Sequence, residues 1–222
     1  DRWGGEMNWT PEFRGGDSIY GESIYTSRYE VIGKYQLPID EKIMMSFSYS
    51  DHDQNSVYGN THYLADQNIA YGQLHWTKKF WDKHDVLLGS ALRYTYYEDN
   101  TPATFSSDSL NPFNKADEFY LPGIFVQDEI TLNEKHKMLF GVRYDRDSRH
   151  GDIFTPRFNY KWQPNKNNTI RLSTGTGYRV VNLFTEDHAA TTGARDVIIN
   201  GNLKPERSYN VNLHYQKFIN TS

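Results

Sequence analysis

The sequence predicts an all-β fold, namely part of an antiparallel transmembrane β-barrel with about nine strands. Two observations lead to this prediction. Nine stretches alternate apolar and polar residues with a period of two, and only a strand turns that period into one apolar and one polar face. The links between these stretches alternate between short and long, as the periplasmic turns and extracellular loops of outer-membrane barrels do. A soluble β-sandwich has no reason to sort its loops in this way.

The first two stretches form the clearest hairpin. Residues 25–37 carry Tyr25, Tyr29 and Val31 on one face, with Arg28 and Glu30 among the residues on the other. After the turn at 38–40 the alternation resumes over residues 43–50. A short turn between two alternating runs is typical of a β-hairpin.

Seven further strands are expected, at residues 68–79, 85–97, 119–132, 137–146, 152–162, 169–179 and 206–217. In each, one parity is largely apolar and the other is polar and often charged, so one face suits hydrocarbon and the other suits water or a polar filling. Asp128 and Pro156 break the pattern because they fall on the apolar parity. A bulge, an error in our register, or a position near the membrane interface could each explain them.

The lengths of the links predict which end of the barrel faces the periplasm and which end faces the cell exterior. The short links are 38–42, 80–84, 133–136 and 163–168, which we expect to face the periplasm. The expected outer loops are about 1–22, 51–67, 98–118, 147–151 and 180–205, of which 147–151 is short. The N-terminus shows no signal peptide and nine is an odd strand count, so we expect an internal segment of a larger barrel.

Composition agrees with a membrane barrel and excludes other classes. Mean hydropathy is −0.79, which a barrel tolerates because half of each strand faces the lumen. Aromatic residues make up 15% of the chain and gather near both ends of the strands, which indicates two interfacial girdles. A net charge of −4 gives no basis for nucleic-acid binding, and the absence of cysteine excludes disulfides and thiolate sites.

Candidate binding residues lie in the expected outer loops. Asp51 and Asp53 belong to an oxygen-rich run that could hold calcium, although a solvated turn explains it as well. The aromatic side chains of these loops could form a recognition surface or pack loop against loop; they include Tyr58, His62, Tyr63, Phe105, Phe113 and Phe184. No nucleophile elbow or other catalytic motif is present, so we do not expect an enzyme.

Several strings resemble those of TonB-dependent outer-membrane receptors, particularly receptors of Bacteroidetes. The runs at 97–104, 121–129, 141–145 and 155–158 share this likeness, which is strongest over 175–186 and 203–208. A strand ending in Gly177-Tyr178-Arg179, then an outer loop, then Leu203-Lys204-Pro205-Glu206, is similar to the late barrel of such receptors. The likeness covers nearly the whole chain.

The resemblance implies a location, a cargo and partners. It implies a plugged, 22-stranded barrel in the bacterial outer membrane that takes up a siderophore, haem, cobalamin or glycan. Uptake would be driven by the TonB complex, acting through a plug and a TonB box that this chain does not contain. Membrane lipid and a surface lipoprotein are the other expected partners. The alternatives are a passive porin-like or structural barrel and, as a further alternative, a soluble β-rich binding module.

Overall fold

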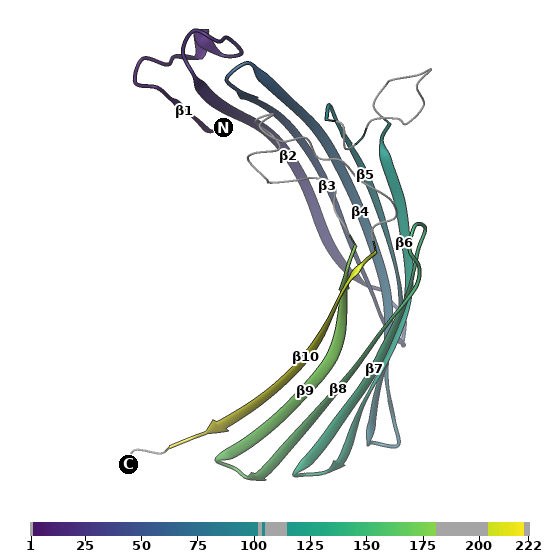
Figure 1. The fold of residues 1–222 in the computed structure, drawn as a ribbon. Coiled ribbons are helices and arrows are strands. Elements are labelled where there is room, and N and C mark those ends of the chain that lie inside the picture. The colour runs from purple at the N-terminus through teal and green to yellow at the C-terminus, as the bar shows by residue number, and fades with distance from the viewer. Residues whose placement is uncertain (1, 102–103, 105–114, 181–203, 220–222) are drawn as a thin grey trace.

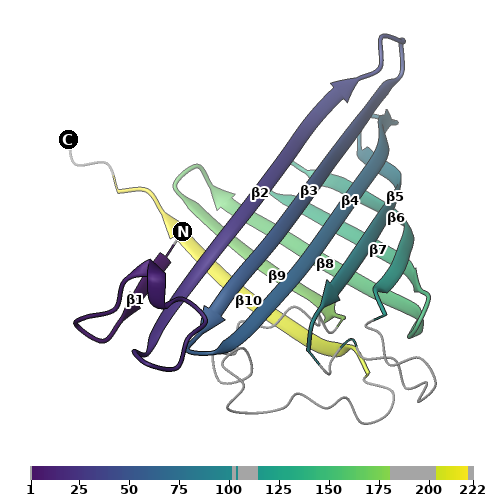
Figure 2. The ribbon, with the colours of Figure 1, turned by 90° about the horizontal axis from the view of Figure 1, so that it is seen from above.

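The computed structural model describes residues 2–101, 104, 115–180 and 204–219. These residues form ten strands and one short 3-10 helix, and all ten strands belong to a single antiparallel sheet in sequence order. The elements are β1 (Arg2–Gly5), η1 (Pro11–Phe13), β2 (Gly21–Gln36), β3 (Lys42–Tyr58), β4 (Thr61–Phe80), β5 (His84–Asp99), β6 (Asp117–Asn133), β7 (His136–Asp147), β8 (Gly151–Asn165), β9 (Asn168–Arg179) and β10 (Glu206–Lys217). The sheet curls into an open trough, so that it resembles a section of a cylinder wall (Figures 1 and 2).

The predicted sorting of the links is confirmed at one end of the sheet. Every link there is short, at residues 37–41, 81–83, 134–135 and 166–167, and we call this the turn end. In the turn Phe80–Lys83 both central residues, Trp81 and Asp82, have positive φ, which is the type I′ pattern that suits a twisted hairpin. The opposite end, which we call the loop end, carries the links 59–60, 100–116, 148–150 and 180–205.

The expected outer loop at 51–67 is wrong. These residues are the distal halves of β3 and β4, which stay paired up to Tyr58 opposite Thr61. The link between them is the two-residue turn Gly59–Asn60, with Gly59 at φ +61°. The β3–β4 pair therefore forms one long hairpin, which stays paired with β2 as far as Glu22 opposite Tyr58 and buries Val57 near its tip.

The strand register confirms the two predicted faces. One row across the sheet pairs Trp76, Leu88, Val126, Val142 and Pro156 in turn, and we call this side the apolar face. The adjacent row belongs to the other side, the polar face, and it pairs Leu87, Gln127, Gly141, Arg157, Gly175 and Asn210 in turn.

Tyrosines on the apolar face mark its boundary with water near the loop end. The hydroxyls of Tyr94, Tyr96 and Tyr144 donate to Glu118, Glu98 and Asp152 at 3.2, 2.6 and 2.9 Å. Each ring therefore lies against the apolar wall while its hydroxyl reaches a polar group, as in an interfacial aromatic girdle. At the turn end, Trp76 Nε1 donates similarly to Glu41 at 2.7 Å.

Asp128 and Pro156 lie on the apolar face in regular register, so neither a bulge nor an error in our register explains them. Asp128 pairs with Val86 and Phe140, and Pro156 pairs with Val142. The ladder between β8 and β9 ends next to Pro156, at Arg157 opposite Gly175. Proline has no N–H to donate, which accounts for the end of the ladder at this point.

The N-terminal segment contains elements that the alternation did not predict. β1 pairs with β2, and η1 follows it. Arg14 holds the segment against the sheet: its Nε donates to Ser23 Oγ at 2.7 Å and its Nη2 to Asn55 Oδ1 at 2.6 Å. The helix η1 is too short to cross a bilayer, and none of the described residues forms a helix that could.

Candidate functional site

A buried ion pair is the most constrained feature of the polar face. Arg143 and Asp145 lie two residues apart on β7 and therefore point to the same side of the sheet. The guanidinium holds the carboxylate with two bonds, from Nε to Oδ2 at 2.8 Å and from Nη2 to Oδ1 at 2.7 Å. Asp145 is completely buried, while the Arg143 side chain keeps 31% of its surface exposed. The pair therefore presents part of a fixed guanidinium to the interior of the trough.

Gly123 on β6 makes room for this pair. It lies directly opposite Asp145 in the register. A Cβ atom at this position would lie 2.0 Å from Asp145 Oδ1 and 2.9 Å from Arg143 Nη2. The neighbouring residue Phe125 adds a ring 5.7 Å from the Arg143 guanidinium carbon. A glycine and an aromatic residue on one strand thus shape the site of the ion pair on the next.

Arg157 provides a second guanidinium on the polar face. It crosses Gly141, where an added Cβ would lie 2.7 Å from Arg157 Nε, and it donates to Gln127. Among the residues that the structure describes, no carboxylate forms an ion pair with Arg157. A hollow of about 420 Å³ lies between the two arginines and is also lined by Gln73, Leu87, Phe125 and Thr155. Charge and shape there suit an anionic or hydrogen-bond-accepting group.

A cluster of tyrosines packs the polar face near the loop end. Tyr58, Tyr63, Ala65 and Tyr97 are buried together, with Ile24 against them. The hydroxyls of Tyr63 and Tyr97 lie 3.1 Å apart, and Tyr97 donates to Asp99 Oδ2 at 2.5 Å. Burial raises the pKa of Tyr63 to about 12, and burial with the bond to Asp99 raises the pKa of Tyr97.

Asp99 ties this cluster to the first residues of the next loop. Its Oδ1 accepts from the Thr101 amide at 2.9 Å and from Thr104 Oγ1 at 2.7 Å. The phenol network therefore holds the root of the loop after β5, and its residues are structural in this arrangement.

The predicted recognition residues are not brought together as one exposed surface. Tyr58 and Tyr63 are 5% and 1% exposed, so they are buried and do not form an exposed surface, and their contact with a ligand stays a prediction. His62 lies on the other side of the sheet, where its Nε2 faces Gly15. Phe105, Phe113 and Phe184 lie outside the described residues.

The carboxylates proposed for calcium are in β3 and not at a loop tip. Asp53 pairs with Asp66 across the β3–β4 ladder, and Asp51 pairs with Asn68. Burial and the charges of Asp53 and Asp51 raise the pKa of Asp66. Within the described ranges no three histidine or acidic side chains are arranged to hold a metal ion. Calcium binding at Asp51 and Asp53 stays a prediction.

Sequence patterns alone did not find the two arginine sites. Alternation places Arg143, Asp145 and Arg157 on the polar parity, but the pairing of Asp145 with Gly123 depends on the register between strands. The space that Gly123 leaves for the Asp145 carboxylate can be recognised only when the register between the two strands is known. The Gly59–Asn60 turn was the available signal for the tyrosine cluster, because such a pair between apolar residues is typical of a tight hairpin.

Comparison with known proteins places this wall in a family. The model for the family described as TonB dependent receptor-like, beta-barrel matches residues 2–220. The iron-regulated outer membrane virulence protein of Vibrio cholerae serotype O1 is 34% identical over 91 residues, covering 40% of this chain and 14% of the relative.

Solved structures with a similar fold include siderophore receptors. The siderophore receptor PirA from Pseudomonas aeruginosa has a TM-score of 0.67 at 14% identity, over 90% of this chain and 38% of that one. The alcaligin receptor FauA from Bordetella pertussis has a TM-score of 0.55 at 17% identity, over 89% and 34%. This chain thus spans less than half of either receptor.

The matches agree with the expected fold class and with a transport receptor rather than an enzyme. None of them tests the narrower likeness to receptors of Bacteroidetes. In such a barrel the apolar face of the sheet meets lipid, and we expect the turn end to face the periplasm. The chain belongs to the TonB-dependent receptor family, as part of its β-barrel, in the bacterial outer membrane.

Proposed function

We propose that this chain is part of the wall of a receptor that takes up an iron–siderophore complex, energised by TonB. The single observation that carries the proposal is the match of residues 2–220 to the receptor barrel. The iron-regulated name of the Vibrio relative and the siderophore receptors among the similar structures favour iron over the other cargoes. Haem, cobalamin and glycans remain as outcomes that the test below distinguishes.

The polar face has the chemistry that this function requires. Arg143 is fixed by Asp145, whereas Arg157 is held only by the neutral Gln127 among its described contacts. Ferric siderophores commonly present anionic oxygen donors, and a plug domain also presents carboxylates. Either one would gain charge-assisted hydrogen bonds from a guanidinium in a partly desolvated hollow.

Growth on single nutrient sources tests the cargo. A strain that lacks the full-length receptor is supplied with one iron source, haem, cobalamin or glycan at a time, with and without the receptor gene. We expect rescue on a ferric siderophore, and we expect loss of that rescue when the TonB gene is also deleted. Rescue on haem, cobalamin or a glycan alone would show that this nutrient is the cargo and that a ferric siderophore is not. Rescue that persists without TonB would instead favour a passive porin-like channel.

Arg157 is the residue through which the polar face can be tested. Replacing Arg157 with glutamine removes its charge but keeps a hydrogen-bonding side chain, and we expect uptake to fall about tenfold, the value of one charged contact. Arg146 is the matched control because it is an arginine on the apolar face that pairs with Asp152 at 2.7 Å. Equal uptake by the Arg157→Gln and Arg146→Gln receptors would show that the polar-face charge is not used.

A further inference from the structure

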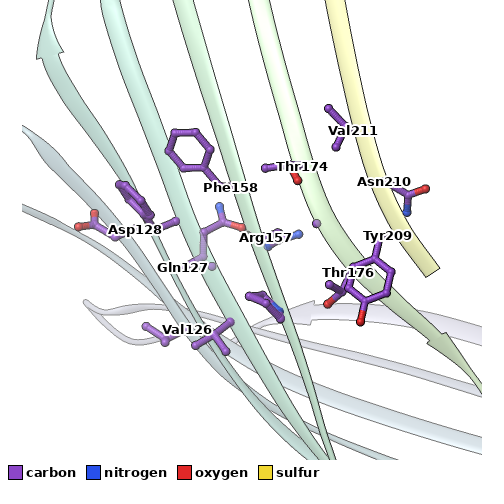
Figure 3. A pocket seen from close by; sticks show the side chains of 15 residues that line it. Val126, Gln127, Asp128, Arg157, Phe158, Thr174, Thr176, Tyr209, Asn210 and Val211 are labelled. Atoms are coloured by element: carbon purple, nitrogen blue, oxygen red, sulfur yellow. Dashed lines mark hydrogen bonds between the residues drawn. The ribbon is translucent and has the colours of Figure 1, made fainter. Parts of the chain in front are cut away.

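A groove crosses the lipid-facing side of the sheet from β6 to β10. It has a volume of about 650 Å³ and a predominantly apolar lining. Its walls include Phe140 and Phe158 on one side and Tyr209 and Val211 on the other, with Thr174 and Thr176 between them. Figure 3 shows Asp128 at one side of this groove and Tyr209 at the opposite side.

The local sequence explains why the groove forms. The β8–β9 ladder ends beside Pro156, which lacks an N–H, so the two strands are free to separate there. The residues on the lipid side near this point, Pro156, Thr174 and Thr176, are small compared with the rings around them. The groove spans four strand spacings of about 4.8 Å, or about 19 Å, which accommodates much of an extended acyl chain.

A carboxylate lies at the end of the groove nearest β5. Asp128 Oδ2 accepts a hydrogen bond from His84 Nδ1 at 2.7 Å. The other oxygen, Oδ1, is buried and has no hydrogen-bond partner among the described residues. A carboxylate on a lipid-facing surface is costly unless it is paired, and the Asp128 side chain keeps 28% of its surface exposed, where a further donor can meet it beside His84.

The Asp128 carboxylate lies at the depth in the membrane where we expect lipid headgroups. His84 is the first residue of β5 and pairs with Phe80, and the Trp81 ring lies edge-on to it at 6.0 Å. With Trp76, whose ring centroid is 6.2 Å from that of Phe80, these side chains form the periplasmic aromatic girdle. Asp128 therefore lies just inside the girdle, where headgroups of the inner leaflet meet their acyl chains.

We propose that this surface is a binding site for phosphatidylethanolamine of the inner leaflet. The ammonium group of the headgroup donates to the exposed part of the Asp128 carboxylate, beside its bond to His84, and one acyl chain lies in the groove. Two features choose this occupant. The groove is continuous with the lipid-contacting wall, and the charge of the Asp128 carboxylate, which lines it, is complementary to an ammonium group. The site does not depend on the cargo of the receptor.

Native mass spectrometry of the purified full-length receptor tests the proposal. The receptor is delipidated and titrated with palmitoyl-oleoyl phosphatidylethanolamine, its N,N-dimethyl form, or the phosphatidylcholine, which differ only in the hydrogen-bond donors of the amine. We expect one lipid to be retained with a preference of about tenfold for the primary amine over the choline, the value of one charge-assisted bond. Equal retention of the three lipids would overturn the headgroup assignment without any variant.

Two variants test headgroup recognition by Asp128 and acyl-chain binding in the groove independently. Asp128→Asn should abolish the preference among headgroups while retaining a lipid, and Thr174→Phe should weaken retention of all three lipids by filling the groove. Asp85→Asn is the matched control, since Asp85 lies near the same level of the membrane but on the polar face. Heat-modifiable electrophoretic mobility confirms that each variant is folded. An Asp128→Asn receptor with the wild-type preference, or a Thr174→Phe receptor with wild-type retention, would contradict the site.

Discussion

Replacing Gly123 with alanine tests whether the Arg143–Asp145 pair depends on the space that this glycine leaves. The new Cβ would lie 2.0 Å from Asp145 Oδ1, about 1.4 Å inside the shortest ordinary contact of 3.4 Å. If the carboxylate moves away by that distance, its bonds of 2.7 and 2.8 Å to Arg143 lengthen to about 4 Å and are lost.

The cost follows from the burial of the carboxylate. Asp145 is completely buried, so a broken pair leaves a charge without its partner, and we expect the free energy of unfolding to fall by about 2–4 kcal/mol. Urea unfolding of the refolded full-length receptor, followed by tryptophan fluorescence, measures this loss. Gly72→Ala is the control because nothing lies within 4 Å of a Cβ at that strand position, and we expect a change below about 1 kcal/mol.

A double-mutant cycle decides whether the cost passes through Asp145. In a receptor that already carries Asp145→Ala, the Gly123→Ala change meets no carboxylate and should cost at least about 2 kcal/mol less than in the wild type. Additive effects of the two substitutions would refute the reasoning, because they would place the strain of Gly123→Ala elsewhere in β6.

Three other predictions concern the two ends of the sheet. Burial raises the pKa of Tyr63 from 10 to about 12. The stability that the protonated phenol contributes is therefore intact below pH 10 and is lost as the pH rises from 10 to 12. The urea midpoint of the Tyr63→Phe receptor should fall less steeply across that window than the wild-type midpoint. Asp82→Gly should stabilise the receptor by about 1 kcal/mol in the same unfolding assay, since glycine adopts φ +55° without strain, and no gain would argue against a strained turn. Gly59→Val should destabilise by at least about 1 kcal/mol, because φ at this residue is +61° and its Cβ would crowd the Tyr20 ring at 3.2 Å; a neutral result would contradict the tight hairpin.

The sequence predicted the nine main strands because a barrel wall has a different solvent on each side. Hydrocarbon on one side and water on the other enforce a period of two, as the rows through Val126 and Gln127 show. The pattern disappears in the distal halves of β3 and β4, where Asp51, Asp53 and Asn55 lie on the same side as Phe47 farther down the strand. Polar residues replace apolar ones on that side there, so alternation of hydrophobicity no longer identifies the strand.

The candidate site was less predictable because it depends on contacts between strands. Alternation could place Arg143, Asp145 and Arg157 on the polar face but could not show which carboxylate each guanidinium meets. Tyr58 and Tyr63 were expected to be exposed because their segment was interpreted as a loop, whereas hairpin pairing buries them against Tyr97. Pro156 and Asp128, which broke the sequence pattern, proved to border the lipid-side groove.

The central claim is that alternate residues of one strand face lipid and lumen, and single-cysteine labelling tests it most directly. The chain has no cysteine of its own, so cysteines placed at Leu88, Val126 and Phe140, and at Leu87, Gln127 and Leu139, report individual positions in a full-length receptor otherwise free of cysteine. In lipid vesicles we predict that a fluorophore on the first three is quenched by nitroxides on acyl chains, while the second three react with a water-soluble thiol reagent and resist lipid quenching. Equal quenching at adjacent positions would contradict the account.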